Sequence, residues 1–259
     1  MDKLLFIVDI GNTTINFAIF EGENIISSKK ILTSGSELDD IKKTVIEVVK
    51  DAKKENTIFD GGLISSVVPR ISRLVQIAIN NVINKEIPII DKRYNSFVKM
   101  DITCKDEVGS DLLADLAAAN ELYSYPALIV DLGTITKFLF INENGEFTHT
   151  NFFPGMGLCS SIMSDKTALL PKVEVAEKEI KFMGTNTIEA MESGLYMGHV
   201  FMIQGYVDEL KKKYKNIKFI LTGGYASNVY KLLDDFIYDK DLLLKGVKIL
   251  YEKGVKNGL

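Results

Sequence analysis

A strand-turn-strand pattern occurs twice in this chain, and this repeat constrains the fold more than any other feature. The residues from Asp9 read DIGNTTINFAIFEGEN, and those from Asp131 read DLGTITKFLFINENGE. In each copy an apolar run ends at Asp-x-Gly and a threonine, a second apolar run follows, and an acidic turn with glycine comes next. The copies start about 120 residues apart, roughly half of the chain, as two duplicated lobes would require.

An ordinary β-hairpin is the alternative explanation of this repeat. Any hairpin in an α/β protein has apolar strands around a polar turn, and this accounts for the two turns. It does not account for Asp, Gly and Thr at the end of the first strand in both copies. We therefore interpret the repeat as a duplication.

The rest of the pattern alternates strands with helices, which is typical of an α/β sheet covered on its faces. Helical periodicity predicts helices over residues 37–52, 72–84, 107–123 and 227–236, with Ser34 and Ser36 as candidate N-caps of the first. Apolar runs predict strands over residues 4–8, 16–20, 62–68, 87–90, 127–130, 137–141, 219–221 and 242–251. Since no linker separates the halves, the repeat alone places the boundary, giving an N-terminal lobe over 1–122 and a C-terminal lobe over 123–259.

Composition and charge argue against several classes of function. With 46% hydrophobic and 25% charged residues and a net charge of -4, the chain is globular and lacks the basic field that nucleic acid requires. The most basic stretch, residues 211–218, is interpreted as the solvated end of a helix, with a phosphate-binding patch as the alternative. The apolar run before Asp9 is too short for a membrane span and lacks a cleavage site. We therefore expect a cytoplasmic protein without a membrane partner.

The cysteines and histidines predict no metal site. Cys104 and Cys159 lie far apart without metal-binding spacing and are expected to be free thiols. His149 and His199 are expected to be structural. Several methionines have the spacing of core or interface residues: Met163, Met183, Met191, Met197 and Met202.

The Asp-x-Gly turns carry the candidate chemistry. A carboxylate at the end of a buried strand, followed by glycine, can hold hydrated Mg²⁺ while backbone N–H groups face phosphate oxygens. The first copy offers Asp9, Gly11, Asn12 and Thr13, and the second offers Asp131, Gly133 and Thr134. A third turn with two glycines, Thr222-Gly223-Gly224, suits the face of a nucleotide base or its ribose. Two such phosphate-binding turns can bind one polyphosphate from both sides.

This order of motifs resembles the nucleotide site of the actin/hexokinase/acetate kinase superfamily, in which two duplicated ribonuclease-H-like α/β lobes enclose a nucleotide cleft. Further segments narrow the resemblance to the type III pantothenate kinases and together cover most of the chain. These segments are DIGNT from Asp9, SSVVP from Ser65, EVGSD and LLADLAAA from Glu107, DLGT from Asp131, PGMGL from Pro154, LPKVE from Leu170, TNTIEAMESGLYMG from Thr185 and TGGYA from Thr222.

The resemblance implies an enzyme and a set of ligands. The enzyme is a kinase that uses ATP to phosphorylate pantothenate to 4'-phosphopantothenate, the first step of coenzyme A biosynthesis. The resemblance also implies Mg²⁺, a monovalent cation (K⁺ or NH₄⁺) and a homodimer with the substrate site near its interface.

Roles follow where the motifs match. Asp111 corresponds to the catalytic aspartate, which orients or deprotonates the attacking hydroxyl. Asp9 would bind Mg²⁺, and Asp131 would serve the metal or monovalent cation site. The phosphates and nucleotide would be bound by Gly11, Asn12, Thr13, Gly133, Thr134, Gly223 and Gly224. Gly109 and Thr187 would lie at the pantothenate end, with Gly155 and Gly157 shaping a nearby turn.

Two of these residues also have simpler explanations. Asp is a favoured N-cap and first-turn residue, so Asp111 is equally suited to capping the helix that begins there. Thr187 is a candidate cap of the helix over 188–197. Capping and catalysis are compatible for Asp111, and the sequence leaves both open.

The chain departs from the family pattern at several positions: Leu112 replaces an arginine after the catalytic aspartate, Lys105 a proline, Ile102 an aromatic residue, Lys137 a hydroxyl residue and Leu139 an aspartate. The Lys137 ammonium is a candidate replacement for a lost cation. Two alternatives to an active pantothenate kinase therefore stay open. One is a catalytically altered nucleotide-binding or regulatory paralogue, and the other is a phosphatase or a kinase of a different small alcohol.

Overall fold

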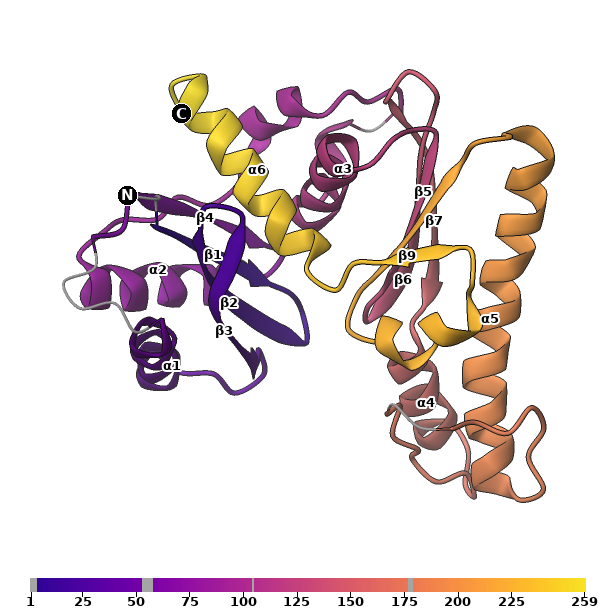
Figure 1. Cartoon of the computed structure of the whole chain (residues 1–259). Helices are drawn as coiled ribbons and strands as arrows, with labels where there is room; N and C mark the ends of the chain where they lie inside the picture. The colour runs from indigo at the N-terminus through magenta and orange to yellow at the C-terminus, as the bar shows by residue number, and fades with distance from the viewer. Residues whose placement is uncertain (1–3, 53–57, 104, 177–178) are drawn as a thin grey trace. The chain divides into compact units, whose positions relative to one another are not determined.

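The structure, a computed structural model, describes residues 4–52, 58–103, 105–176 and 179–259 (Figure 1). The chain forms two compact units. The N-terminal unit comprises Met1–Glu121 with Leu242–Leu259, and the C-terminal unit comprises Leu122–Asp241. The prediction that residues 123–259 form one lobe is wrong for the last segment, because its helix packs on strands of the N-terminal sheet.

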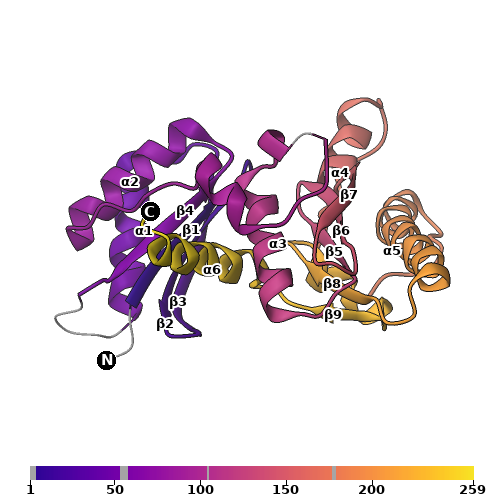
Figure 2. The same cartoon turned by 90° about the horizontal axis from the view of Figure 1, so that it is seen from above.

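The N-terminal unit is built on a sheet of order β3-β2-β1-β4. Strands β1 (Leu4–Ile10), β2 (Thr14–Glu21) and β3 (Asn24–Leu32) are antiparallel, and β4 (Gly61–Ser66) is parallel to β1. Helices α1 (Leu38–Asp51) and α2 (Pro69–Ile83) cover one face, and α6 (Leu242–Lys256) lies on the other beside α3 (Ser110–Leu122) (Figure 2). With both faces covered, every residue of β1 is buried.

The C-terminal unit repeats this order with one more strand, as β7-β6-β5-β8-β9. Strands β5 (Ala127–Leu132), β6 (Ile135–Ile141) and β7 (Phe147–Pro154) are antiparallel, and β8 (Lys218–Thr222) and β9 (Phe236–Tyr238) run parallel to β5. Helix α4 (Met156–Asp165) packs on α5 (Thr187–Lys213), whose buried residues share a core with this sheet. The matching strand order supports the predicted duplication.

Two predicted elements are wrong in type. Residues 242–251 form the helix α6 rather than a strand, and residues 227–236 contain two 3₁₀ turns, η3 (Ala226–Asn228) and η4 (Tyr230–Leu232), rather than a helix. In α6, four of the seven buried positions, Leu242, Gly246, Leu250 and Gly254, recur every four residues. Because two of the four are glycines, the helical period is hidden from a count of apolar residues.

Smaller elements also differ from the prediction. Two half-exposed edge strands, β3 and β7, were not predicted because their polar residues mask the alternation. Residues 87–90 make only a single bridge, between Ile64 and Ile89. The N-cap of α1 is Glu37, while the Ser36 hydroxyl donates to the Leu32 carbonyl. Short 3₁₀ turns η1 (Lys92–Phe97) and η2 (Lys105–Glu107) precede α3.

The remaining composition-based predictions concern helix ends, membranes and cysteines. The basic stretch is confirmed as an exposed helix end, since Lys211, Lys212 and Lys213 form the last turn of α5. Within the described ranges, no helix is long and apolar enough to cross a membrane. Cys159 is a free thiol whose pKa is raised by burial. Cys104 lies outside the described residues.

Candidate active site

The first phosphate turn, residues 9–13, lies at the end of β1. It begins at Asp9, which is buried with 8% of its surface exposed. Asn16, directly opposite on β2, donates from Nδ2 to Asp9 Oδ2 at 3.3 Å. Ser65, beside it on the parallel strand β4, donates from Oγ to Asp9 Oδ1 at 3.2 Å. Between the strands, Asn12 and Thr13 are exposed in the turn. The carboxylate is thus held from two strands while the turn residues remain accessible.

A chain of hydroxyl groups connects this carboxylate to the start of α3. Ser65 Oγ lies 3.1 Å from Ser110 Oγ, and Ser110 Oγ accepts from the Ser66 N–H at 2.9 Å. Because the Ser65 proton goes to Asp9, the Ser110 hydroxyl is the donor to Ser65 or to the Ser66 carbonyl, at 3.1 Å in either case. Ser110 is the first residue of α3. The helix that carries Asp111 is therefore attached to the phosphate turn.

Asp111 lies in the first turn of α3, where the helix dipole favours a carboxylate. A Cβ built on Gly109 would lie 2.6 Å from Asp111 Oδ1, so a side chain at Gly109 would displace the carboxylate. The structure thus brings Gly109, Asp111 and Asp9 into one region of the N-terminal unit. This position suits both a catalytic and a capping role.

The second phosphate turn, at the end of β5, also begins at a buried carboxylate. Asp131 has 6% of its surface exposed and lies opposite Lys137 on β6, whose Nζ donates to Asp131 Oδ2 at 2.6 Å. Thr222 pairs with Asp131 on the parallel strand β8. The next residue, Gly223, has a φ of 97°, and a Cβ there would lie 2.3 Å from Asp131 Oδ1. Only glycine suits this position, because both the backbone angle and the close approach exclude a side chain.

The PGMG motif also packs on this turn. The Gly155 N–H donates to the Thr134 carbonyl at 3.0 Å, and a Cβ on Gly155 would lie 2.2 Å from the Gly133 carbonyl oxygen. A Cβ on Gly157 would lie 2.2 Å from the Tyr225 hydroxyl oxygen. Three motifs that are far apart in the sequence, DLGT, PGMG and TGGYA, therefore form one site in the C-terminal unit.

Thr187 lies at the start of α5 and is exposed. The prediction that it caps this helix is wrong, because the cap is Asn186, whose side chain accepts from the Glu189 N–H at 3.0 Å. Glu189 in turn accepts from the N–H and hydroxyl of Thr185 at 2.9 and 2.8 Å. Hydrogen bonds from Lys181 and Thr185 lower the pKa of Glu189 to about 2. Thr187 is thus available for a contact outside the helix.

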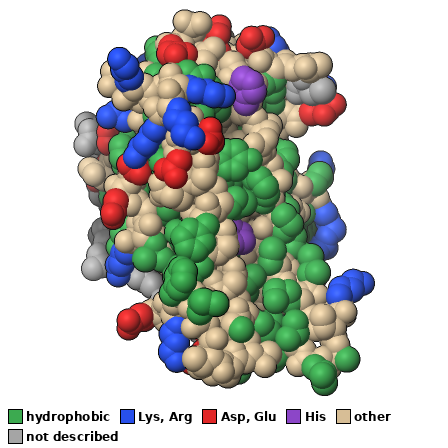
Figure 3. Space-filling model, turned by 90° about the vertical axis from the view of Figure 1, so that its right-hand side faces the viewer, with side chains coloured by type: hydrophobic (Ala, Val, Ile, Leu, Met, Phe, Trp, Pro, Cys, Tyr) green, Lys and Arg blue, Asp and Glu red, His purple; other side chains and the backbone are tan. Residues whose placement is uncertain are grey.

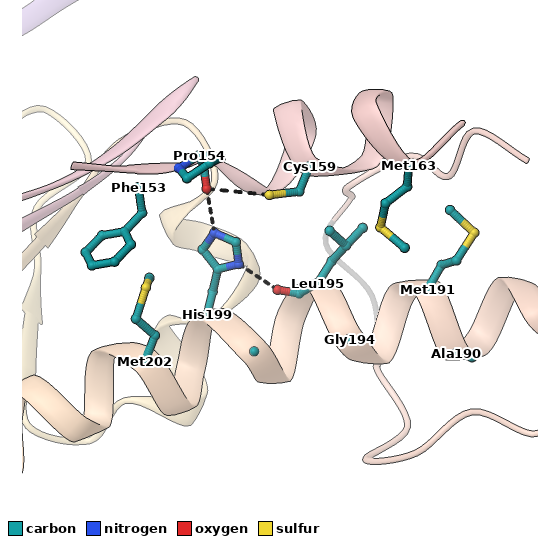
Figure 4. Close-up of a pocket in the computed structure, with 11 residues that line it drawn as sticks. Phe153, Pro154, Cys159, Met163, Ala190, Met191, Gly194, Leu195, His199 and Met202 are labelled. Carbon is teal, nitrogen blue, oxygen red and sulfur yellow. Dashed lines mark hydrogen bonds between the residues drawn. The ribbon is translucent and has the colours of Figure 1, made fainter. Parts of the chain in front are cut away.

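A groove of about 390 Å³ lies between α4 and α5 in the C-terminal unit (Figure 4). Its lining is apolar and rich in sulfur, with Met163, Met191, Met202 and Cys159 among the lining residues. Within it, the His199 ring contacts the carbonyl oxygens of Leu195 and Pro154 at 2.8 and 3.3 Å, as expected for a structural histidine. Hydrophobic side chains gather along this face of the molecule (Figure 3).

The positions that depart from the family pattern have different surroundings. Leu139 is fully buried in the sheet, so an apolar residue suits its place. Leu112 is half-buried in the first turn of α3, and Lys105 is exposed in η2. Lys137 hydrogen-bonds the predicted site residue Asp131, so its departure from the family pattern has a direct chemical consequence.

The repeated α/β units and their strand order define a fold of the actin/hexokinase-like class. A solved activator of the 2-hydroxyisocaproyl-CoA dehydratase from Clostridium difficile, with bound ADPNP, is similar in fold, with a TM-score of 0.53, 14% identity and coverage of 99% of this chain and 98% of that one. A conserved putative Baf family transcriptional activator from Campylobacter jejuni has a TM-score of 0.60 and 18% identity, over 97% and 99% of the two chains.

The sequence comparisons identify the family. The family model described as type III pantothenate kinase matches residues 5–209, and the chain belongs to this family. A type III pantothenate kinase from Halalkalibacterium halodurans is 29% identical over 255 residues, which cover 97% of this chain and 100% of the relative. Another, from Geobacillus sp. (strain WCH70), is 30% identical over 257 residues, covering 97% and 98%. The predicted family resemblance is confirmed.

Several contacts of the site were not predicted from the sequence. They involve Asn16, Ser65, Ser110 and Tyr225. Ser65 had a recognisable signal, because β1 and β4 are neighbouring parallel strands whose carboxyl ends meet at one edge of the sheet. Ser110 had none, since its partner Ser66 is far away in the sequence.

Proposed function

We propose that this protein transfers the γ-phosphoryl group of ATP to the primary hydroxyl of pantothenate, which yields 4'-phosphopantothenate for coenzyme A synthesis. Membership of the type III pantothenate kinase family supports the reaction. The observation that carries the proposal for this chain is the hydroxyl chain from Asp9 through Ser65 to Ser110, which couples a phosphate turn to the helix of Asp111.

In this proposal Asp111 orients the attacking hydroxyl and accepts its proton. General-base help of this kind contributes about 10²–10⁴-fold to the rate. Holding the hydroxyl in line with the phosphoryl group contributes more, because the transition state of phosphoryl transfer has little covalent chemistry for the protein to perform. Gly109 leaves space for the Asp111 carboxylate, and exposed Thr187 contacts the pantothenate end.

The phosphate and nucleotide contacts are assigned to the three glycine turns. Backbone N–H groups of residues 11–13 and 133–134 bind phosphate oxygens, and Gly223 and Gly224 approach the base or ribose. The exposed turn residues and the tight packing of Gly155 and Gly223 on the second turn support this assignment.

Asp9 is the proposed residue for Mg²⁺. Mg²⁺ keeps several waters and binds through one or two carboxylates together with substrate phosphates, so a single buried carboxylate beside an exposed turn fits it. When bound, the ion neutralises charge on the phosphate oxygens. Asn16 and Ser65 keep the Asp9 carboxylate in one orientation.

We also propose a homodimer formed through the apolar face around the groove. Phe201 and Phe182, whose ring centroids lie 6.1 Å apart, are 55% and 66% exposed, and Met183 is 75% exposed on the same unit. Exposed apolar patches of this kind mark interaction surfaces. Phe201→Glu is expected to halve the mass measured by light scattering, and an unchanged mass would contradict this interface. The cytoplasm, which supplies ATP, is the proposed compartment.

The experiment that tests the reaction is a kinase assay on the full-length protein with ATP, Mg²⁺ and pantothenate, with and without K⁺ or NH₄⁺. Product is measured by mass spectrometry. Asp111→Asn is expected to lower kcat by about 10²–10⁴-fold, with ATP affinity within about threefold. Asp106→Asn, which changes an exposed carboxylate nearby on η2, is the matched control and should keep full activity.

Three other outcomes have distinct meanings. ATP binding without product under any condition supports the regulatory alternative. Turnover of another small alcohol, but not pantothenate, supports the altered-acceptor alternative. An Asp111→Asn variant that fails to fold, or that keeps full activity, identifies Asp111 as a helix cap.

A further inference from the structure

The ion pair between Asp131 and Lys137 occupies the position predicted for a metal or monovalent cation. The Lys137 ammonium lies 2.6 Å from Asp131 Oδ2, and the two side chains are only 14% and 9% exposed. The two residues are direct cross-strand neighbours in the β5–β6 register. A charge-assisted hydrogen bond of this length in a largely buried place is strong.

The other oxygen of this carboxylate is also confined. A Cβ on Gly223 would lie 2.3 Å from Asp131 Oδ1, so the backbone of the third glycine turn passes directly beside it. One oxygen is therefore held by the ammonium and the other faces closely packed backbone. A metal ion would have to displace a bound, oppositely charged lysine to coordinate Asp131, so this carboxylate does not fit the predicted cation site.

The duplicated position in the N-terminal unit differs in charge. There Asp9 has Asn16 opposite it on the neighbouring strand and Ser65 beside it, at 3.3 and 3.2 Å. An amide and a hydroxyl bring no charge to the carboxylate, whereas Lys137 brings a full positive charge to Asp131. The two copies of one hairpin thus place a neutral group in one lobe and a cation in the other.

We propose that the Lys137 ammonium is a built-in monovalent cation for the second phosphate turn. Asp131 then anchors Lys137 rather than a metal, and the charge next to Gly133 and Thr134 comes from the protein itself. Turnover consequently needs no added K⁺ or NH₄⁺. This inference rests on the proposed kinase function, and it identifies Lys137 as a positioning and charge-supplying residue.

The test compares initial rates of the full-length protein in K⁺ and in tetramethylammonium salts at constant ionic strength. The unaltered protein is expected to change by less than about twofold between the two salts. Lys137→Thr is expected to lose at least about tenfold in rate without K⁺ and to regain most of it when K⁺ or NH₄⁺ is added. Lys212→Thr, which removes the exposed pair with Glu209, is the matched control and should respond to neither salt.

A second readout does not depend on turnover. K⁺ should raise the melting temperature and the affinity for a non-hydrolysable ATP analogue in Lys137→Thr but not in the unaltered protein. If Lys137→Thr does not fold, Lys137→Gln retains a hydrogen-bond donor to Asp131 without the charge and should behave in the same way.

Two results would overturn the inference: an unaltered protein that needs K⁺ for at least a tenfold rate increase, or a Lys137 variant that folds and keeps full rate and analogue affinity without K⁺. If the unaltered protein has no turnover in any salt, the kinase proposal fails. The melting and analogue-binding measurements then still decide the role of Lys137.

Discussion

Ser65→Ala is the substitution that most directly tests how the site is assembled. Ser65 has no exposed surface, and its hydroxyl group bonds both Asp9 and Ser110. Removal of one oxygen atom therefore breaks the side-chain link between Asp9 and Ser110, while the Ser66 backbone still bonds Ser110. The fold around it can remain intact, because the backbone pairing of β4 with β1 does not involve this hydroxyl.

The magnitude follows from the two bonds that are lost. A hydrogen bond to a charged group contributes about 1.5–3 kcal/mol, and one between neutral groups about 0.5–1.5 kcal/mol. Ser65→Ala should therefore lower the free energy of unfolding by about 2–4.5 kcal/mol. Since misplacement of a reacting group by about 1 Å costs about 10²-fold in rate, we expect kcat to fall by about 10- to 100-fold.

The assay measures the free energy of unfolding in urea and the kcat of the same preparation. Ser72→Ala is the matched control, because Ser72 is also buried and its hydroxyl bonds Ser66 Oγ and the Val68 carbonyl at 2.6 and 3.0 Å. It should lose about 1–3 kcal/mol of unfolding free energy, because both bonds join neutral groups, but keep kcat within about twofold. If Ser65→Ala behaves like this control, Ser65 only stabilises the fold and the reasoning is refuted.

Three further substitutions test other parts of the structure. Gly155→Ala places a Cβ 2.2 Å from a carbonyl of the second phosphate turn and should weaken ATP binding by at least about tenfold in calorimetry. Gly205→Ala, with open space around the added Cβ, is the control and should bind ATP as the unaltered protein does. Equal ATP affinities of the two variants would contradict this prediction. Gly246→Ala places a Cβ 1.9 Å from a backbone carbonyl of α3 and should lower the free energy of unfolding by about 1–3 kcal/mol or more. An unchanged urea midpoint would show that α6 does not pack on α3 at this position. Because the folded-state pKa of Glu189 is lowered from 4.5 to about 2, its stabilisation is present above about pH 4.5 and is lost as the pH falls toward 2. Glu189→Gln should therefore lower the melting temperature at pH 7, and this loss should become progressively smaller below pH 4.5. Glu143→Gln, at an exposed position, is the control and should not show this pH-dependent loss. A loss that does not change with pH would refute the assignment.

Local pattern was sufficient for the elements whose residues alternate or repeat clearly. The buried strands β1, β5 and β8 and the helices α1, α2 and α3 lie where the sequence predicts them, within a few residues. The pattern failed where packing replaces apolar side chains by glycine, as at Gly246 and Gly254 of α6. It also failed for the edge strands β3 and β7, since a strand with one solvated edge tolerates polar residues.

For the candidate site too, local sequence was sufficient for some features and not for others. Residue types and motif order were sufficient to select Asp9, Asp111 and Asp131 and to predict the family, because each lies in a short local motif. Motifs do not carry the information about which side chain contacts which. The sequence identified Lys137 only as a departure from the family pattern whose ammonium is a candidate replacement for a lost cation. The cross-strand register decides that it binds Asp131.

By itself, the sequence determined that two similar halves each present a carboxylate and a glycine turn at the end of a buried strand. Tertiary structure alone decided that Ser65 and Ser110 bridge Asp9 to α3, that Lys137 forms an ion pair with Asp131, and that α6 returns to the N-terminal unit. The physical reason is one of range. Turn and strand preferences act between neighbours along the chain, whereas these contacts join distant residues through sheet register and helix packing.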